Sequence, residues 1–168
     1  STDGMGVINW GINGDRPFSA DFSGDKEADF GIFRGTLDPT SYDFWMLNTP
    51  SFGHEPISWG VPGDIPFGGD YNGDGNADLA VYRQSDNTFY IYVRGASPEQ
   101  RILPFGLPGD IPQAGDFDGD GMMDVGMYRP SNGTWYIAPA TGTPASANTQ
   151  IQFGLPTDKP GPADYDVD

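Results

Sequence analysis

The sequence predicts an all-β fold built from repeated sets of four short antiparallel strands. Three observations support this prediction. A block of 46 to 49 residues recurs in register, each block contains about four short runs rich in β-forming residues, and no stretch has a helical period. The 25 glycines and 16 prolines also suit short strands joined by turns. This length and strand count match one blade of a β-propeller, so we expect propeller-like blades in about three and a half repeats.

Each repeat begins with a short motif in which an aromatic residue and glycine precede Asp-x-Pro. The four copies span residues 10–17, 59–66, 105–112 and 153–160. Their aspartates are Asp15, Asp64, Asp110 and Asp158, and six residues after each of these another aspartate opens an acidic loop. In the three full copies an arginine follows the loop, at Arg34, Arg83 and Arg129. We interpret the motif aspartates as turn caps or as ion-pair partners of these arginines.

The expected strands are the short apolar or alternating runs between turns. In the first copy they are residues 17–20, 30–33, 43–47 and 57–59; in the second, 65–69, 79–83, 88–93 and 101–105; in the third, 111–114, 125–128, 134–138 and 149–153. Asp86-Asn87 and Asn132-Gly133 predict hairpin turns. One further strand candidate, residues 6–10, precedes the first repeat.

The repeats predict a single domain over residues 1–168. It comprises an orphan strand in 1–11, blades at 12–60, 61–106 and 107–154, and the start of a fourth repeat at 155–168. Closed propellers usually have about 4–8 blades. The chain is therefore a fragment of a longer propeller, one half of a two-chain ring, or a subunit that joins its neighbours through terminal strands.

The charge balance restricts the partners. With 24 acidic and 8 basic side chains the net charge is −16, which argues against binding to nucleic acid or to anionic membranes. No apolar run approaches the roughly 20 residues that a membrane helix needs. There is no cysteine for disulfides or thiolate metal sites. Multivalent cations are the expected partners. The polar start at Ser1 predicts a mature or excised segment, from which any secretion signal has already been removed.

The acidic loops have oxygen-bearing residues at positions 1, 3, 5 and 9 and glycine at position 4. They span residues 21–29, 70–78 and 116–124. Calcium takes six to eight oxygen ligands in a tolerant geometry, which such a loop can supply. Position 7 varies and includes Met122, so only its backbone carbonyl is expected to act. An EF-hand is excluded, because position 12 holds Ile32, Val81 or Met127 instead of glutamate.

The loop and the Phe-Gly or Trp-Gly segment before it resemble FG-GAP (integrin-α-like) repeats and the related VCBS-type repeats of bacterial surface proteins. The resemblance covers nearly the whole chain. It implies a β-propeller blade with Ca²⁺ bound between its first two strands. The implied ligands are Asp21, Ser23, Asp25, Glu27 and Asp29 in the first loop; Asp70, Asn72, Asp74, Asn76 and Asp78 in the second; and Asp116, Asp118, Asp120, Met122 and Asp124 in the third. Position 7 contributes its carbonyl. Asp164, Asp166 and Asp168 begin a partial fourth site.

The alternative for these loops is a set of solvated Asp/Asn/Gly turns, which are common. Three copies in register favour metal binding, because clustered carboxylates repel one another without a cation. The irregular all-oxygen ligand set favours calcium over magnesium. Ser23 is a weaker ligand, so the first site is expected to be the least secure.

These features predict a calcium-binding extracellular or cell-surface module with a structural, adhesive or assembly role. One alternative is a lectin-like, carbohydrate-binding propeller or an appendage of a secreted enzyme. Its sugar platforms would come from the aromatic pairs Phe44-Trp45, Phe89-Tyr90 and Trp135-Tyr136. Another is a subunit of a strand-exchanged fibre, and a cell-surface protein is a further expected partner. We expect no catalytic activity, because His54, the only histidine, has no nucleophile or orienting carboxylate paired with it.

Overall fold

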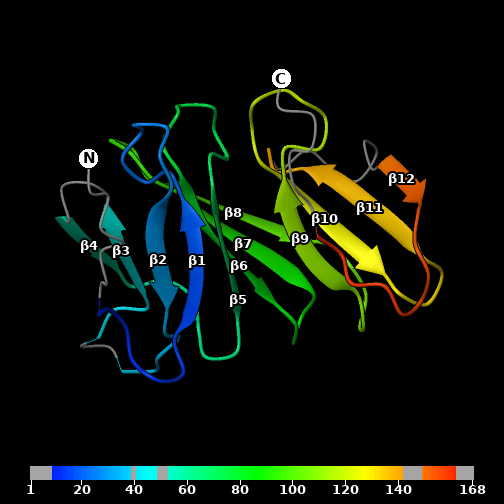
Figure 1. The fold of residues 1–168 in the computed structure, drawn as a ribbon, viewed down its shortest axis with the longest axis horizontal. Helices are drawn as coiled ribbons and strands as arrows, with labels where there is room; N and C mark the ends of the chain where they lie inside the picture. Colours follow the sequence, from blue (N-terminus) through cyan, green and yellow to red (C-terminus); the bar gives the residue numbers. More distant parts are fainter. Residues whose placement is uncertain (1–8, 39–40, 49–52, 142–148, 162–168) are drawn as a thin grey trace, which may run out of the picture.

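The structure, a computed structural model, describes residues 9–38, 41–48, 53–141 and 149–161. Within these residues the regular structure is entirely β, in three antiparallel sheets of four strands each. The sheets follow one another in chain order across the molecule and do not close into a ring (Figure 1). The predicted all-β fold of propeller-like blades is confirmed. The described residues include no helix long and apolar enough to cross a membrane.

The strands of each sheet lie in the order in which they occur in the chain. The first sheet contains β1 (Arg16–Ala20), β2 (Asp29–Phe33), β3 (Phe44–Asn48) and β4 (Gly53–Ile57). The second contains β5 (Ile65–Gly69), β6 (Asp78–Arg83), β7 (Thr88–Val93) and β8 (Glu99–Pro104). The third contains β9 (Ile111–Gly115), β10 (Asp124–Arg129), β11 (Thr134–Pro139) and β12 (Thr149–Gln152). Each sheet is therefore a meander in which neighbouring strands are joined in sequence.

The last strand of the first sheet differs from the prediction. We expected residues 57–59, but β4 is Gly53–Ile57 and pairs with β3 from Asn48 opposite Gly53 to Phe44 opposite Ile57. The Pro56 in this strand suggests a turn, yet an edge strand tolerates a proline because its outer side needs no hydrogen bond. Trp59 lies beyond the strand, with its ring 5.4 Å from that of Tyr92 in the next sheet. The candidate strand at residues 6–10 lies mostly outside the described residues, and Asn9 and Trp10 are not in a strand.

Both predicted hairpin turns are present. Asn87 joins β6 to β7 with a φ of 53°, and Gly133 joins β10 to β11 with a φ of 63°. Asparagine and glycine are the residues that adopt this left-handed conformation most readily. The turn residues therefore fix the register of the two central strands of these sheets.

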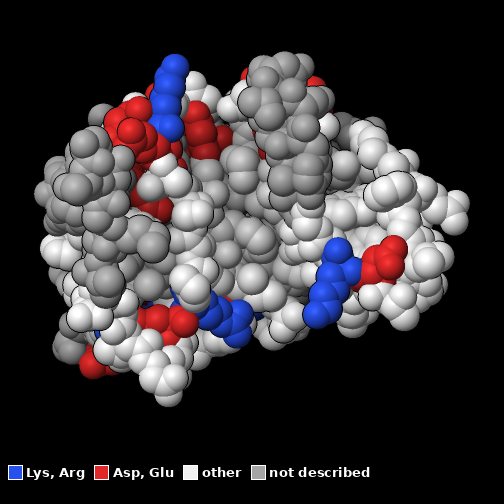
Figure 2. Space-filling view, in the orientation of Figure 1, with Lys and Arg blue, Asp and Glu red and all other residues white. Residues whose placement is uncertain are grey.

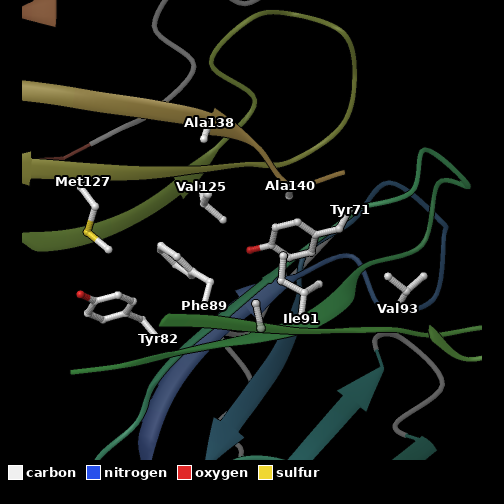
Figure 3. Packing of buried hydrophobic residues seen from close by; sticks show 10 residues of the cluster. Tyr71, Tyr82, Phe89, Ile91, Val93, Val125, Met127, Ala138 and Ala140 are labelled. Carbon is white, nitrogen blue, oxygen red and sulfur yellow. The ribbon is translucent and has the colours of Figure 1, made fainter. Parts of the chain in front are cut away.

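The core consists of two layers, each between neighbouring sheets. Between the first and second sheets, Phe33, Phe44 and Met46 pack with Leu79 and Val81. Between the second and third, the buried side chains come from both sheets and are Tyr71, Ala80, Tyr82, Phe89, Ile91, Val93, Val125, Met127, Ala138 and Ala140 (Figure 3). The middle sheet is thus covered on both faces, which explains the continuous burial of Asp78 to Tyr82 along β6.

One buried polar atom in this core gives a stability prediction. The hydroxyl of Tyr71 is buried and has no hydrogen-bond partner among the described residues, and the corresponding residues of the other sheets are Phe22 and Phe117. We expect Tyr71→Phe to stabilise the fold by about 1 kcal/mol, because a buried unpaired hydroxyl is costly. Urea unfolding measures the effect. Tyr82→Phe is the control, since its hydroxyl lies 3.3 Å from Asn87 Oδ1 and its loss should destabilise; destabilisation by both variants would contradict the interpretation.

The motif aspartates have the predicted roles. Arg34, Arg83 and Arg129 each donate two hydrogen bonds of 2.8 to 3.0 Å to Asp15, Asp64 and Asp110, respectively. The same carboxylates accept the N–H three residues before them, from Ile12, Val61 and Leu107. Each aspartate thus caps a turn and ties it to the second strand of its sheet. Asp158 keeps the turn cap, with a bond of 2.8 Å from the Leu155 N–H.

Candidate metal centres

The three complete acidic loops occupy the same place in each sheet, between the first and second strands. Residues 21–29 join β1 to β2, 70–78 join β5 to β6, and 116–124 join β9 to β10. All three lie at one end of the molecule, at the top of the view in Figure 1. Figure 2 shows acidic side chains gathered at that end. The loops therefore form one row across neighbouring sheets.

The aspartate at position 1 organises each loop. Its Oδ1 accepts the N–H of the position 4 glycine at 2.6 Å from Gly24, 2.6 Å from Gly73 and 2.7 Å from Gly119. Its Oδ2 accepts the N–H of position 6 at 2.7 to 2.9 Å. The loop backbone thereby wraps around this carboxylate. Oδ1 also accepts the N–H of position 5, at 3.1 to 3.2 Å. Each carboxylate oxygen has two lone pairs, so Oδ1 is fully used by the loop backbone, whereas Oδ2 keeps acceptor capacity for a cation.

The aspartate at position 9 is buried at the base of the loop. Asp29, Asp78 and Asp124 are 0, 1 and 3% exposed, and each accepts the N–H of position 2 at 2.8 to 3.1 Å. Burial raises the pKa of Asp78 to about 6 and that of Asp124 to about 6, and in both cases the neighbouring loop carboxylates add to the increase. Bringing a cation to these loops would therefore offset both burial and mutual repulsion.

The third loop has the donor set best suited to a cation. One carboxylate oxygen from each of Asp116, Asp118 and Asp120 lies within 4.8 Å of the others, and all three side chains are exposed. Oxygens of calcium ligands lie about 2.3–2.6 Å from the ion, so this spacing fits three oxygens around one ion. The second loop has an amide at position 3, where Asn72 Nδ2 donates to Asp74 Oδ2 at 3.1 Å. The first has a hydroxyl there, and Ser23 Oγ lies 3.4 Å from Asp21 Oδ1.

The first loop departs from the other two at position 6. Gly75 and Gly121 occupy it with φ of 85° and 86°, whereas Lys26 occupies it with φ of 70°. A residue with a Cβ is strained in this left-handed region. The sequence difference is visible in the repeat alignment, but its energetic meaning requires the backbone angle.

This strain predicts that Lys26→Gly stabilises the chain by about 1 kcal/mol relative to Lys26→Ala. Both variants remove the same positive charge, so the comparison isolates the backbone effect. Urea unfolding at a fixed calcium concentration measures the difference. Equal stabilities of the two variants would contradict a strained position 6.

Contacts between neighbouring loops are a feature that the sequence analysis missed. The position 8 N–H of one loop donates to the position 1 carbonyl of the preceding loop, from Ala77 to Asp21 at 2.6 Å and from Met123 to Asp70 at 2.7 Å. The position 7 side chains also face the preceding loop: a Cβ added to Gly24 would lie 2.6 Å from Asn76 Oδ1. This leaves the position 7 carbonyl, not the side chain, as the expected ligand. The sequence feature that could have indicated this contact is the glycine at position 4, because the absence of a side chain there leaves room for the next loop.

The roles of the other expected ligands remain predictions. The side chains of Glu27 and Asp25 are exposed, and Asp25 Oδ1 accepts the Glu27 N–H at 2.9 Å, as the position 5 aspartates do in the other loops. The partial fourth site of Asp164, Asp166 and Asp168 lies outside the described residues.

A comparison with known protein families agrees with the motif. Residues 70–127, from the second acidic loop to the third, match the model of the FG-GAP-like repeat. Comparisons with curated proteins and with solved structures find no match. This part of the chain is therefore an FG-GAP-like repeat, as its motifs predict.

Proposed function

We propose that the protein is a calcium-binding β-repeat module of the extracellular space or cell surface, with a structural or adhesive role. The observation that carries the proposal is the third loop, where three exposed carboxylates from Asp116, Asp118 and Asp120 converge. The same loop backbone recurs in the first and second sheets. Extracellular modules typically bind calcium at about 10⁻⁴–10⁻³ M, so the ion would be bound outside the cell and would rigidify thin, glycine-rich sheets.

Equilibrium dialysis with calcium quantification tests the proposal. We expect three ions per chain from the complete loops, and one fewer in a variant with Asp116→Asn, Asp118→Asn and Asp120→Asn. Asp158→Asn is a matched control outside the three loops and should keep the full number. Binding that is unchanged by the loop substitutions would contradict the assignment of these residues.

A second candidate role is assembly by contact between copies, as part of a ring or fibre. Phe153 favours it. The corresponding Trp59 and Phe105 are packed against the core layers between sheets, whereas Phe153 is 76% exposed. It borders a cavity of 390 Å³ with Tyr128 and Trp135. Sedimentation velocity over a range of concentrations distinguishes a monomer from an assembly, and Phe153→Ser should abolish any association that uses this face.

A further inference from the structure

A guanidinium group lies beside an acidic loop at each junction between neighbouring sheets. At the junction of the first and second sheets it belongs to Arg94, whose Nη1 donates to Ala77 O at 2.6 Å and to Phe22 O at 3.4 Å. At the junction of the second and third sheets it belongs to Arg101, whose Nη1 donates to Tyr71 O at 2.9 Å and to Ala140 O at 3.3 Å. Both arginines thus bind the carbonyl of loop position 2, on Phe22 and Tyr71.

The two arginines come from different positions of the repeat. Arg94 follows β7 of the second sheet and pairs with Glu55 on β4 of the first. The strand register shows which positions correspond between sheets. Arg101 in the second sheet corresponds to Glu55 in the first, and Ala140 in the third sheet corresponds to Arg94 in the second. A positively charged side chain therefore lies at both junctions. At the first junction it comes from the later of the two sheets, and at the second junction it comes from the earlier one.

Arg94 also contacts the base of the second loop through its backbone. Its N–H donates to Asp78 Oδ1 at 2.7 Å, while Asp78 Oδ2 accepts the Tyr71 N–H at 3.0 Å. The position 2 residue thus has its N–H held by the position 9 aspartate and its carbonyl held by a guanidinium. The side chains of Arg94 and Arg101 are only 13 and 15% exposed, so these contacts are largely shielded from water.

We propose that Arg94 and Arg101 are positioning residues for the metal loops, each fixing a loop against the neighbouring sheet in one arrangement. Arg94 serves the first and second loops, which it contacts at Phe22 and Ala77. Arg101 serves the second loop, which it ties at Tyr71 to Ala140 of the third sheet. Their own charges are balanced by Glu55 and Glu99. Their main effect is therefore preorganisation of the loop oxygens, which is what residues surrounding metal ligands provide. The expected change in calcium affinity rests on the proposed function, whereas the expected change in loop structure does not.

The test is a calcium titration followed by the amide NMR signals of Gly24, Gly73 and Gly119, one from each loop. Arg94→Met is expected to weaken calcium binding about 10-fold or more at the first two loops and to leave the third unchanged. Arg101→Met is the matched control, which should weaken calcium binding at the second loop and spare the first. Equal weakening at all three loops, or unchanged affinities, would overturn the proposal.

A rescue variant separates positioning from a merely structural contribution. Glu55→Arg combined with Arg94→Ala reproduces at the first junction the arrangement of Arg101 and Ala140 at the second. It is expected to restore calcium affinity at the first two loops, and a failure to restore it in a folded protein would contradict the proposal.

Amide hydrogen exchange in calcium-free protein gives a readout that does not depend on the ion. Arg94→Met should accelerate exchange of the Ala77 N–H, which bridges the first two loops, more than that of the Met123 N–H, which bridges the next two. Equal rates in the variant and the unsubstituted protein would overturn the proposed positioning role. If calcium caused no NMR shift in the unsubstituted protein, the proposed function would fail while the exchange measurement still decided this inference.

Discussion

Removal of calcium is expected to lower the melting temperature by on the order of 10–30 °C. At about 10 mM calcium and dissociation constants of about 10⁻⁴–10⁻³ M, each site would contribute about 1.4–2.7 kcal/mol by mass action. Three sites would then contribute about 4–8 kcal/mol. For a chain of 168 residues, each kcal/mol corresponds to about 2–4 °C.

Calorimetric melting in calcium and in excess EDTA measures this shift, and magnesium at the same concentration is the control. Magnesium demands a regular octahedron and gives up its water reluctantly, so it should restore only a small part of the stability. A melting temperature that does not respond to EDTA would contradict calcium stabilisation of the fold.

Substitution of Arg83 by methionine is expected to destabilise the chain by about 3–5 kcal/mol, the usual cost of leaving a buried charge without its partner. Asp64 is 1% exposed and accepts two bonds from Arg83, at 3.0 and 2.9 Å. The Arg83 guanidinium also lies 4.3 Å from the Tyr90 ring centre. Removing Arg83 therefore leaves the Asp64 carboxylate unpaired in the turn before β5. It also removes the contact of the guanidinium with the Tyr90 ring in the middle sheet.

The double variant Arg83→Met with Asp64→Leu distinguishes the unpaired charge from lost packing. Replacement of both partners by apolar side chains is often nearly neutral, so most of the stability should return, less the turn bond from the Val61 N–H at 3.0 Å. Urea unfolding of the three proteins measures this. A single variant within about 1 kcal/mol of the unsubstituted protein would show that the ion pair contributes little.

Much of the fold could be predicted because the repeats share one alternation pattern. Residues such as Leu79 and Val81 on one side of β6, and Ala80 and Tyr82 on the other, mark a strand that is covered on both faces. β4 escaped prediction because its edge position permits Pro56, which weakens the strand signal, while Trp59 extends the apolar pattern beyond the strand end.

The candidate sites could be located from the sequence, but their connections could not. The aspartates of one loop are close together in the chain, so their spacing can be read directly from the sequence. The contacts of Arg94 with Phe22 and Glu55 join residues 72 and 39 positions apart in the chain. Moreover, the corresponding position of the third sheet holds Ala140, so the repeat alignment gives no indication that a guanidinium belongs there.

The central claim is that the three complete loops bind calcium, and a site-resolved titration tests it most directly. The N–H groups of Gly24, Gly73 and Gly119 donate to the position 1 aspartates, so their NMR signals report on each loop separately. We expect all three to shift and saturate on addition of calcium to about 10 mM, within the affinity range of extracellular sites. With Asp120→Asn, the Gly119 response should weaken while the Gly24 response remains. Signals that stay in place throughout the titration would contradict calcium binding by these loops.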